Sequence, residues 1–218
     1  MSEANERVKR IVVGITGASG AVYARGVLRG LLAAGVEVHL VVTKCGRRLL
    51  SDELGVDLGD GVAGLIGVSG VGDGGDGDGH GRGVGEVIVH PVNDIGASIA
   101  SGTFEHGGMV VVPCSSNSLG MIANGIGNNL LTRAAAVCLK EGRRLVLAHR
   151  ESPLNLIDIE NMRRLALAGA VIAPANPGWY LRPVCLDDIA NFVSGRLLDA
   201  LGVEHDLVGR WGEGAGDG

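Results

Sequence analysis

The segment Ile11–Gly20, which reads IVVGITGASG, constrains the fold more than any other part of the chain. Its apolar, β-branched first half is typical of a buried strand, and the small residues from Thr16 to Gly20 predict a tight turn. A helical pattern begins at Ala21. Because free N–H groups and the positive end of the helix dipole meet at such a helix start, this turn is a natural anion site. We therefore predict that it holds a phosphate-bearing ligand.

The rest of the chain alternates between strand and helix patterns. Strands are predicted at Val8–Gly14, Glu37–Thr43, Val87–His90, Gly108–Pro113, Arg144–His149 and Ala170–Ala173. Helices are predicted at Ser19–Ala34, Cys45–Leu54, Asp94–Ala100, Leu119–Asn124, Asn129–Glu141, Leu156–Ala168 and Leu186–Leu201. The strands are apolar throughout, as expected when helices cover both faces of a sheet. This pattern predicts an α/β fold with a doubly wound, mostly parallel sheet.

Residues 55–86 interrupt the alternation with a segment dominated by Gly and Asp. Such a segment has much backbone entropy to lose and little apolar surface to bury. We expect a flexible surface insertion within one domain that spans residues 1–218, and a disordered tail at residues 213–218. The DGGDGDG stretch is similar to calcium-binding Gly/Asp repeats, but the absence of a nonapeptide period disfavours calcium binding.

Composition and charge exclude several classes of function. The net charge of -5 and the scattered Lys and Arg residues disfavour nucleic-acid binding. No signal-peptide pattern and no apolar run of membrane-spanning length are present in the sequence. The four cysteines show neither CxxC nor Cys/His ligand spacing, so no metal site is expected. We expect a cytoplasmic protein with reduced thiols that binds neither nucleic acid nor a membrane.

Small polar residues follow several predicted strands. They are Thr43 and Lys44, the Ser101–Thr103 turn, the Ser115–Ser118 loop, and the segment from His149 to Glu151. In a doubly wound sheet these positions lie at one edge, where hydroxyl and N–H groups bind phosphates and ring edges. The first turn lacks the Gly-Lys-Ser/Thr of a Walker loop and the GxGxxG of dinucleotide sites. FMN therefore fits better than NAD or ATP.

Several longer segments resemble the UbiX flavin prenyltransferases, formerly called 3-octaprenyl-4-hydroxybenzoate carboxy-lyases. They are TGASG, PCSSNSLGMIANGIGNNLLTRAA, LKEGRRLVLAHRESPLNLIDIENM, GAVIAPANPGWYLRP and the terminal RWGE. The resemblance implies a Rossmann-like flavoprotein fold assembled as a homododecamer. It implies that reduced FMN and dimethylallyl monophosphate are the substrates and that no metal is required. The implied product is prenylated FMN, the cofactor of UbiD-type decarboxylases.

The resemblance also implies the site residues. The flavin contacts would be Gly17, Ala18, Ser19, Thr43 (where Ser is usual), Ser115, Ser116, Asn117, Ser118 and Arg150. The prenyl phosphate would be held by Arg133, Lys140, Tyr180 and Arg196. Catalytic roles would fall to Ser19, Glu151, Lys140 and Trp211, while Glu53 matches an acidic residue whose role is open.

These residues suggest a physical mechanism. Lys140 and its cationic neighbours would stabilise the leaving phosphate through charge-assisted hydrogen bonds, and Tyr180 would donate another. The π face of Trp211 would stabilise the allylic cation. Glu151 and the released phosphate are the candidate proton carriers. Ser19 is expected near flavin N5.

The residue patterns leave other interpretations open. Arg133 and Lys140 also fit a solvated helix face, Tyr180 fits loop packing, and His149 fits packing at a strand end. The main rival function is an FMN-dependent cysteine decarboxylase of the homo-oligomeric type. That class carries a PxMNxxMW motif, whereas residues 174–180 read PANPGWY without Met-Asn. An FMN carrier without turnover and direct hydroxybenzoate decarboxylation are weaker alternatives.

The chain departs from the family pattern in the Gly/Asp-rich insertion and at Asn117. The sequence leaves open whether the prenyl donor is a monophosphate or a pyrophosphate.

Overall fold

One sheet of six parallel strands organises the structure, a computed structural model that describes residues 10–67 and 85–207. The strands are β1 (Arg10–Ile15), β2 (Glu37–Val42), β3 (Val87–His90), β4 (Gly108–Cys114), β5 (Arg144–His149) and β6 (Val171–Ile172). They lie in the order β3-β2-β1-β4-β5-β6, and every neighbouring pair is parallel. The order reverses between β1 and β4, which is the topological switch point of a doubly wound sheet. The predicted fold class is therefore confirmed.

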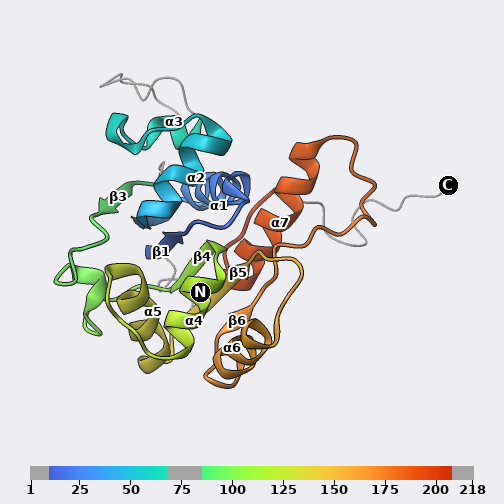
Figure 1. Cartoon of the computed structure of the whole chain (residues 1–218). Helices are drawn as coiled ribbons and strands as arrows, with labels where there is room; N and C mark the ends of the chain where they lie inside the picture. The colour runs from blue at the N-terminus through green and yellow to red at the C-terminus, as the bar shows by residue number, and fades with distance from the viewer. Residues whose placement is uncertain (1–9, 68–84, 208–218) are drawn as a thin grey trace, which may run out of the picture.

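Helices cover both faces of this sheet, as Figure 1 shows. One layer contains α1 (Ala21–Ala33), α2 (Lys44–Leu54), the short α3 (Ala63–Ile66) and α7 (Leu186–Leu201). The other contains α4 (Ser116–Ala123), α5 (Leu130–Lys140) and α6 (Leu156–Leu167). Two 3-10 turns, η3 (Leu58–Asp60) and η4 (Ser98–Ala100), complete the elements of the described residues.

The core has two halves, one on each face of the sheet. Ile11, Val13 and Ile15 of β1 face the α1 and α7 layer, while Val12 faces the α4 and α5 layer. All four side chains are fully buried. Burying both faces explains why the strands are apolar without alternation. The carboxyl ends of these strands are the surface on which the site is built.

Several predicted elements differ from the structure only at their ends, as for α4, which begins at Ser116 and not at the predicted Leu119; two segments differ more. The helix predicted at Asp94–Ala100 is only the 3-10 turn η4, because an Asx turn from the Asp94 carboxylate to Gly96 N (3.2 Å) bends the backbone first. The start of the Gly/Asp-rich segment forms η3 and α3, and Leu65 of α3 is fully buried. The remainder at 68–84 and the tail at 208–218 lie outside the described residues, so their expected flexibility stays a prediction.

Residues 10–67 and 85–207 contain neither a membrane-spanning helix nor a metal-binding cluster. Among them, no helix combines the length and apolar character needed to cross a bilayer. Within the same ranges, no group of three or more His, Cys, Asp or Glu side chains is placed to hold a metal ion.

Candidate active site

Thr16 joins the two strands at the switch point. Its hydroxyl donates to the carbonyl oxygen of Pro113 at 2.7 Å and accepts from the N–H of Ser115 at 2.8 Å. The backbone N–H of Thr16 also donates to Pro113 O, at 3.3 Å. The turn after β1 and the loop after β4 are thus fixed side by side by a buried side chain. This is the position at which open α/β sheets bind ligands.

The predicted anion site at the start of α1 holds an anion from the chain itself. The Glu53 carboxylate of α2 accepts from Gly20 N at 3.0 Å and from Ala21 N at 2.8 Å. Burial alone would raise the pKa of Glu53, but hydrogen bonds from Ser19, Ala21 and Gly20 and the charge of Arg150 lower it overall. The helix dipole also favours an ionised carboxylate here. The backbone N–H groups of Gly20 and Ala21, which the sequence analysis predicted to bind a phosphate, are therefore hydrogen-bonded to Glu53.

Arg150 brings a third loop to the same edge. Its Nε donates to Ser19 O at 3.1 Å, and its backbone N–H donates to Cys114 O at 3.2 Å. Glu151 follows it, is exposed, and accepts from Ser152 N at 3.0 Å. The structure therefore places the predicted residues Ser19, Arg150 and the Ser115–Ser118 loop together at the carboxyl edge of the sheet.

The Ser115–Ser118 loop presents hydroxyl groups in several settings. Ser115 Oγ caps α4 by accepting from Ser118 N at 3.3 Å and donates to Ser118 Oγ at 3.2 Å. Ser116 Oγ lies 3.1 Å from His149 Nε2, while the Asn117 side chain is exposed. Helix capping and ligand binding are thus combined in one loop, since the first amides of α4 have no partner within the helix.

The start of α2 packs directly on the β1 turn. A Cβ at Gly17 would lie 2.4 Å from Cys45 Cβ, so only glycine fits this contact. Thr43 caps α2 by accepting from Gly46 N at 3.0 Å, and its backbone N–H donates to Ile15 O at 3.0 Å. This contact brings Thr43 and the first turn of α2 beside Gly17 and Ala18.

Two of the predicted prenyl-phosphate residues lie on α5. Lys140 ends this helix near the beginning of β5, at the opposite edge of the sheet from Ser19, and its Nζ lies 3.3 Å from Glu141 Oε1. Arg133 lies nearer the start of the same helix and is exposed. Among the described residues, neither side chain forms a hydrogen bond or an ion pair with the β1 turn or the β4 loop.

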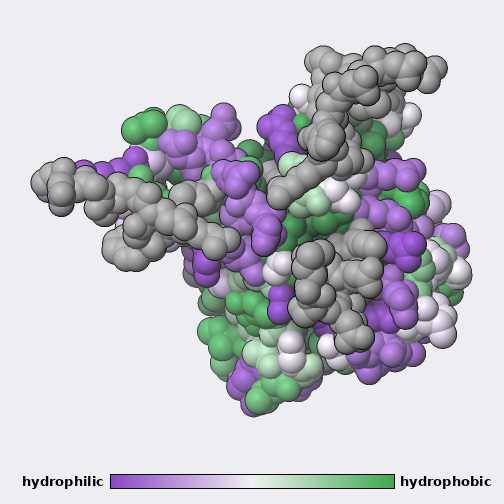
Figure 2. Space-filling model, turned by 180° about the vertical axis from the view of Figure 1, so that it is seen from behind, coloured by the Kyte–Doolittle hydropathy of each residue, from purple (hydrophilic) through white to green (hydrophobic). Residues whose placement is uncertain are grey.

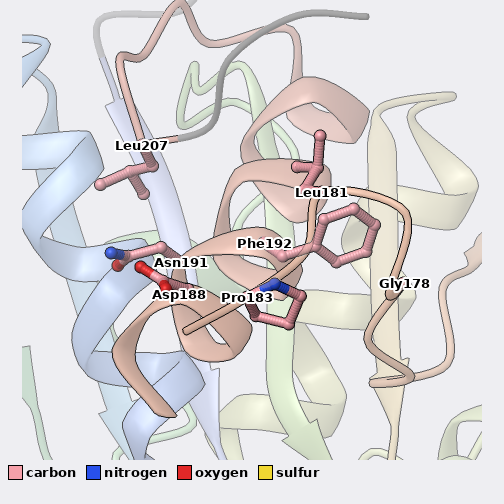
Figure 3. A pocket seen from close by; sticks show the side chains of 7 residues that line it. All are labelled: Gly178, Leu181, Pro183, Asp188, Asn191, Phe192 and Leu207. Carbon is pink, nitrogen blue, oxygen red and sulfur yellow. The ribbon is translucent and has the colours of Figure 1, made fainter. Parts of the chain in front are cut away.

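The other two predicted phosphate residues lie around α7. The Tyr180 ring packs edge-on against Phe192 with centroids 5.5 Å apart, and Arg196 Nη1 pairs with Asp199 Oδ2 at 2.9 Å. A cavity of about 260 Å³ lies between the 178–183 loop and α7, as Figure 3 shows. Its lining residues are Gly178, Leu181, Pro183, Asp188, Asn191, Phe192 and Leu207. Trp211 lies outside the described residues.

Cys114 lies at the end of β4 but has no nucleophilic character. Complete burial raises the pKa of its thiol to about 12. A thiol that stays protonated is unreactive near neutral pH. Its role is packing against the α4 and α5 layer.

Sequence reasoning missed two contributors to the site and one buried acid that acts electrostatically on His149. Thr16 was seen only as part of a turn, the contact between Glu53 and α1 was not foreseen, and Asp158 was not singled out. The Glu53 contact joins residues 32 apart, and no local spacing encodes it. Asp158 in the first turn of α6 has the pattern of an ordinary dipole-stabilising acid. A buried position is its only distinguishing mark.

Known proteins with the same architecture were found by sequence and by structure. The Flavoprotein family model matches residues 1–195. The flavin prenyltransferase UbiX of Halalkalibacterium halodurans is 44% identical over 201 residues, which is 92% of each chain. The structure of AnUbiX in complex with FMN and dimethylallyl pyrophosphate matches with a TM-score of 0.81 at 36% identity, covering 94% of this chain and 98% of that one.

Two further structures separate the candidate functions. A dodecameric FMN-dependent UbiX-like decarboxylase from Escherichia coli matches with a TM-score of 0.77 at 37% identity, covering 90% of this chain and 96% of that one. The FMN-dependent cysteine decarboxylase TvaF reaches a TM-score of 0.55 at 17% identity, covering 88% and 98%. The likeness to the rival class therefore extends to the fold alone.

Proposed function

Since this chain belongs to the Flavoprotein family and, within it, to the UbiX flavin prenyltransferases, we propose that it prenylates reduced FMN. The dimethylallyl group of dimethylallyl monophosphate would be joined to N5 and C6 of the flavin, giving prenylated FMN. One observation carries the proposal beyond family membership. The Ser19 turn, the Ser115 loop and Arg150 meet at the switch point, bound to one another through Thr16 and Ser19.

The residues at this edge fit FMN. Exposed Gly17 and Ser19 leave the backbone of the turn open to a ligand, and the hydroxyls of the Ser115–Ser118 loop suit the polar edge of a flavin ring. Because Glu53 occupies Gly20 N and Ala21 N, the FMN phosphate requires another helix start. The neighbouring first turn of α2, with Thr43 and Lys44, supplies amides and a positive charge.

The prenyl phosphate site requires residues from more than one copy of the chain. Lys140 lies at the far edge of the sheet, and Arg196 lies on an exposed face of α7. A dodecameric relative supports assembly. Exposed apolar side chains support it as well. On α6, Leu156, Ile157 and Leu167 are 72%, 73% and 75% exposed, and Figure 2 shows hydrophobic residues gathered at the lower end of the molecule, where α6 lies. Monomers rarely leave such patches uncovered.

In the assembled site, bound reduced FMN supplies the nucleophilic N5 and C6 atoms. Lys140, Arg133 and Arg196 would hold the prenyl phosphate and stabilise the charge of the leaving group, with a further hydrogen bond from Tyr180. Trp211 would face the allylic cation, and Glu151 would carry the proton that the prenyl alkene takes up. The product would pass to a UbiD-type decarboxylase. The cytoplasmic location of the protein stays a prediction.

The mass of the flavin tests this function. The purified chain is incubated without oxygen with FMN, dithionite and dimethylallyl monophosphate, and in parallel with the pyrophosphate. We expect the extracted flavin to be heavier by one C5H8 unit, and the faster arm identifies the donor. A flavin of unchanged mass in both arms contradicts the proposed function.

A variant pair links the reaction to the site. Glu151→Gln should keep FMN affinity but slow prenylation by roughly 100-fold, the usual contribution of a proton carrier. Glu105→Gln, a substitution of an exposed carboxylate after η4, is the matched control and should prenylate at the wild-type rate. Full activity in Glu151→Gln would remove this residue from the mechanism.

A further inference from the structure

Three polar side chains from three different elements converge behind the Ser115–Ser118 loop. Ser116 lies in the first turn of α4, His149 ends β5, and Asp158 lies in the first turn of α6. His149 is 2% exposed and Asp158 is 3% exposed, whereas Ser116 is half-buried. Burying an imidazole and a carboxylate is costly unless each finds a hydrogen-bond partner. Simple packing at a strand end, as predicted for His149, does not account for this arrangement.

One hydrogen-bonding contact and one electrostatic interaction relate these three side chains. Ser116 Oγ lies 3.1 Å from His149 Nε2, which is a hydrogen-bonding distance. The Asp158 carboxylate acts on His149 from within α6 and favours its protonated form. Asp158 Oδ2 is buried and accepts no hydrogen bond from any described residue. A buried carboxylate oxygen of this kind requires a donor, and the imidazole of His149 has one N–H to offer when it is neutral.

The charges around His149 determine its protonation state. Burial lowers the pKa of His149, and the Arg150 guanidinium adds to this effect. The carboxylates of Asp158 and Glu151 act in the opposite direction without reversing it. The imidazole is therefore neutral at pH 7, with one nitrogen that donates and one that accepts.

We propose that Asp158, His149 and Ser116 form a positioning relay that orients the Ser116 hydroxyl toward bound FMN, a proposal that rests on the proposed function. Asp158 places the imidazole hydrogen on Nδ1, so that Nε2 accepts the hydroxyl hydrogen of Ser116. The lone pairs of Ser116 Oγ then face the ligand and can accept from the N–H on the polar edge of the flavin ring. His149 and Asp158 touch no reacting atom in this scheme, and both are positioning residues.

The relay makes flavin binding depend on the protonation of His149. When His149 gains a second proton, Nε2 donates to Ser116 Oγ, and the hydroxyl hydrogen turns toward the ligand. Ser116 Oγ then no longer accepts from the flavin N–H, and the Ser116 O–H and the flavin N–H face each other as two donors. One hydrogen bond of this kind corresponds to an affinity change of about tenfold. We expect FMN affinity to fall by this factor as the pH falls through the pKa of His149.

The experiment measures the FMN dissociation constant of the full chain by flavin fluorescence between pH 5 and pH 8. Because the FMN phosphate also titrates near pH 6, the informative quantity is the difference between variant profiles. His149→Gln should lack the acid-side loss. Asp158→Asn should move the loss to lower pH, since it removes a carboxylate that raises the His149 pKa. Ser116→Ala should bind FMN about tenfold more weakly at pH 7. His106→Gln, at a buried histidine near the opposite edge of the sheet, is the matched control and should follow the wild-type profile.

Each outcome decides the proposal. Coincident profiles of wild type and His149→Gln overturn it, as does a His149→Gln loss that is equal at every pH, which indicates packing alone. If His149→Gln does not fold, the His149 ring resonances of wild type and Asp158→Asn, followed by NMR through the same pH range, provide the same test. An unchanged His149 pKa in Asp158→Asn overturns the relay. The flavin mass after prenylation is measured in a separate experiment. A failure of the proposed reaction can therefore be distinguished from a failure of the relay, which is tested by FMN binding.

Discussion

Glu53 fills an anion site that the sequence of the β1 turn predicted for a ligand. Its carboxylate satisfies two amides at the start of α1 and also meets Ser19 and the charge of Arg150. The same residue thereby shapes the turn that is proposed to line the flavin. A strand, a small-residue turn and a helix predict that an anion binds, but they do not say whether the anion comes from outside the chain.

Glu53→Gln should destabilise the fold by about 0.5 kcal/mol at pH 7, because an amide replaces a charged acceptor whose exposed position lets water screen it. The pKa of Glu53 lies below its ordinary value of 4.5, so its contribution is present above that value and is lost as the pH falls through the folded pKa. Denaturant unfolding at pH 7 and at pH 3 should therefore show a difference between wild type and variant that shrinks in acid. Asp52→Asn, on the same helix and exposed, is the control. An equal difference at both pH values contradicts this account.

The helices and strands differ in how well local patterns predicted them. β3, β5 and α7 begin and end where their apolar patterns do. The segment of η4 was wrongly predicted to be a helix; Ile99 is buried but Ile95 is exposed. The predicted flavin residues gathered at one edge because parallel topology alone brings strand ends together. Asp158 could not be predicted, since burial of a polar face on α6 depends on the packing of α4 against it.

The contact between α1 and α7 depends on two glycines. A Cβ at Gly26 would lie 2.2 Å from Ser194 Oγ, and one at Gly30 would lie 2.3 Å from a methyl group of Leu198. Gly26→Ala should destabilise the fold by about 1–3 kcal/mol, because the helices must separate. Adding Ser194→Gly should recover part of the loss by restoring space. Thermal unfolding of the two variants measures this, and a single variant as stable as wild type would contradict the tight packing.

At the scale of the whole molecule, the proposed functional groups lie on different surfaces that face in different directions. The flavin edge carries Ser19 and Arg150, α5 carries Lys140 to the other edge, and α6 turns Leu156 and Ile157 outward. These features have one common explanation if copies of the chain associate and each contributes part of a neighbour's site. Local sequence patterns do not show which surfaces meet, because a contact between copies depends on the folded surfaces of both.

Complementation between two inactive variants tests this account most directly. Ser19→Ala and Lys140→Ala carrying different tags are co-expressed, mixed oligomers are purified through both tags, and the prenylated flavin is measured by mass. Random assembly leaves about a quarter of the sites with both wild-type residues, so we predict about a quarter of wild-type activity. Each variant purified alone should be inactive. Mixed oligomers that produce no prenylated flavin would contradict a site shared between copies.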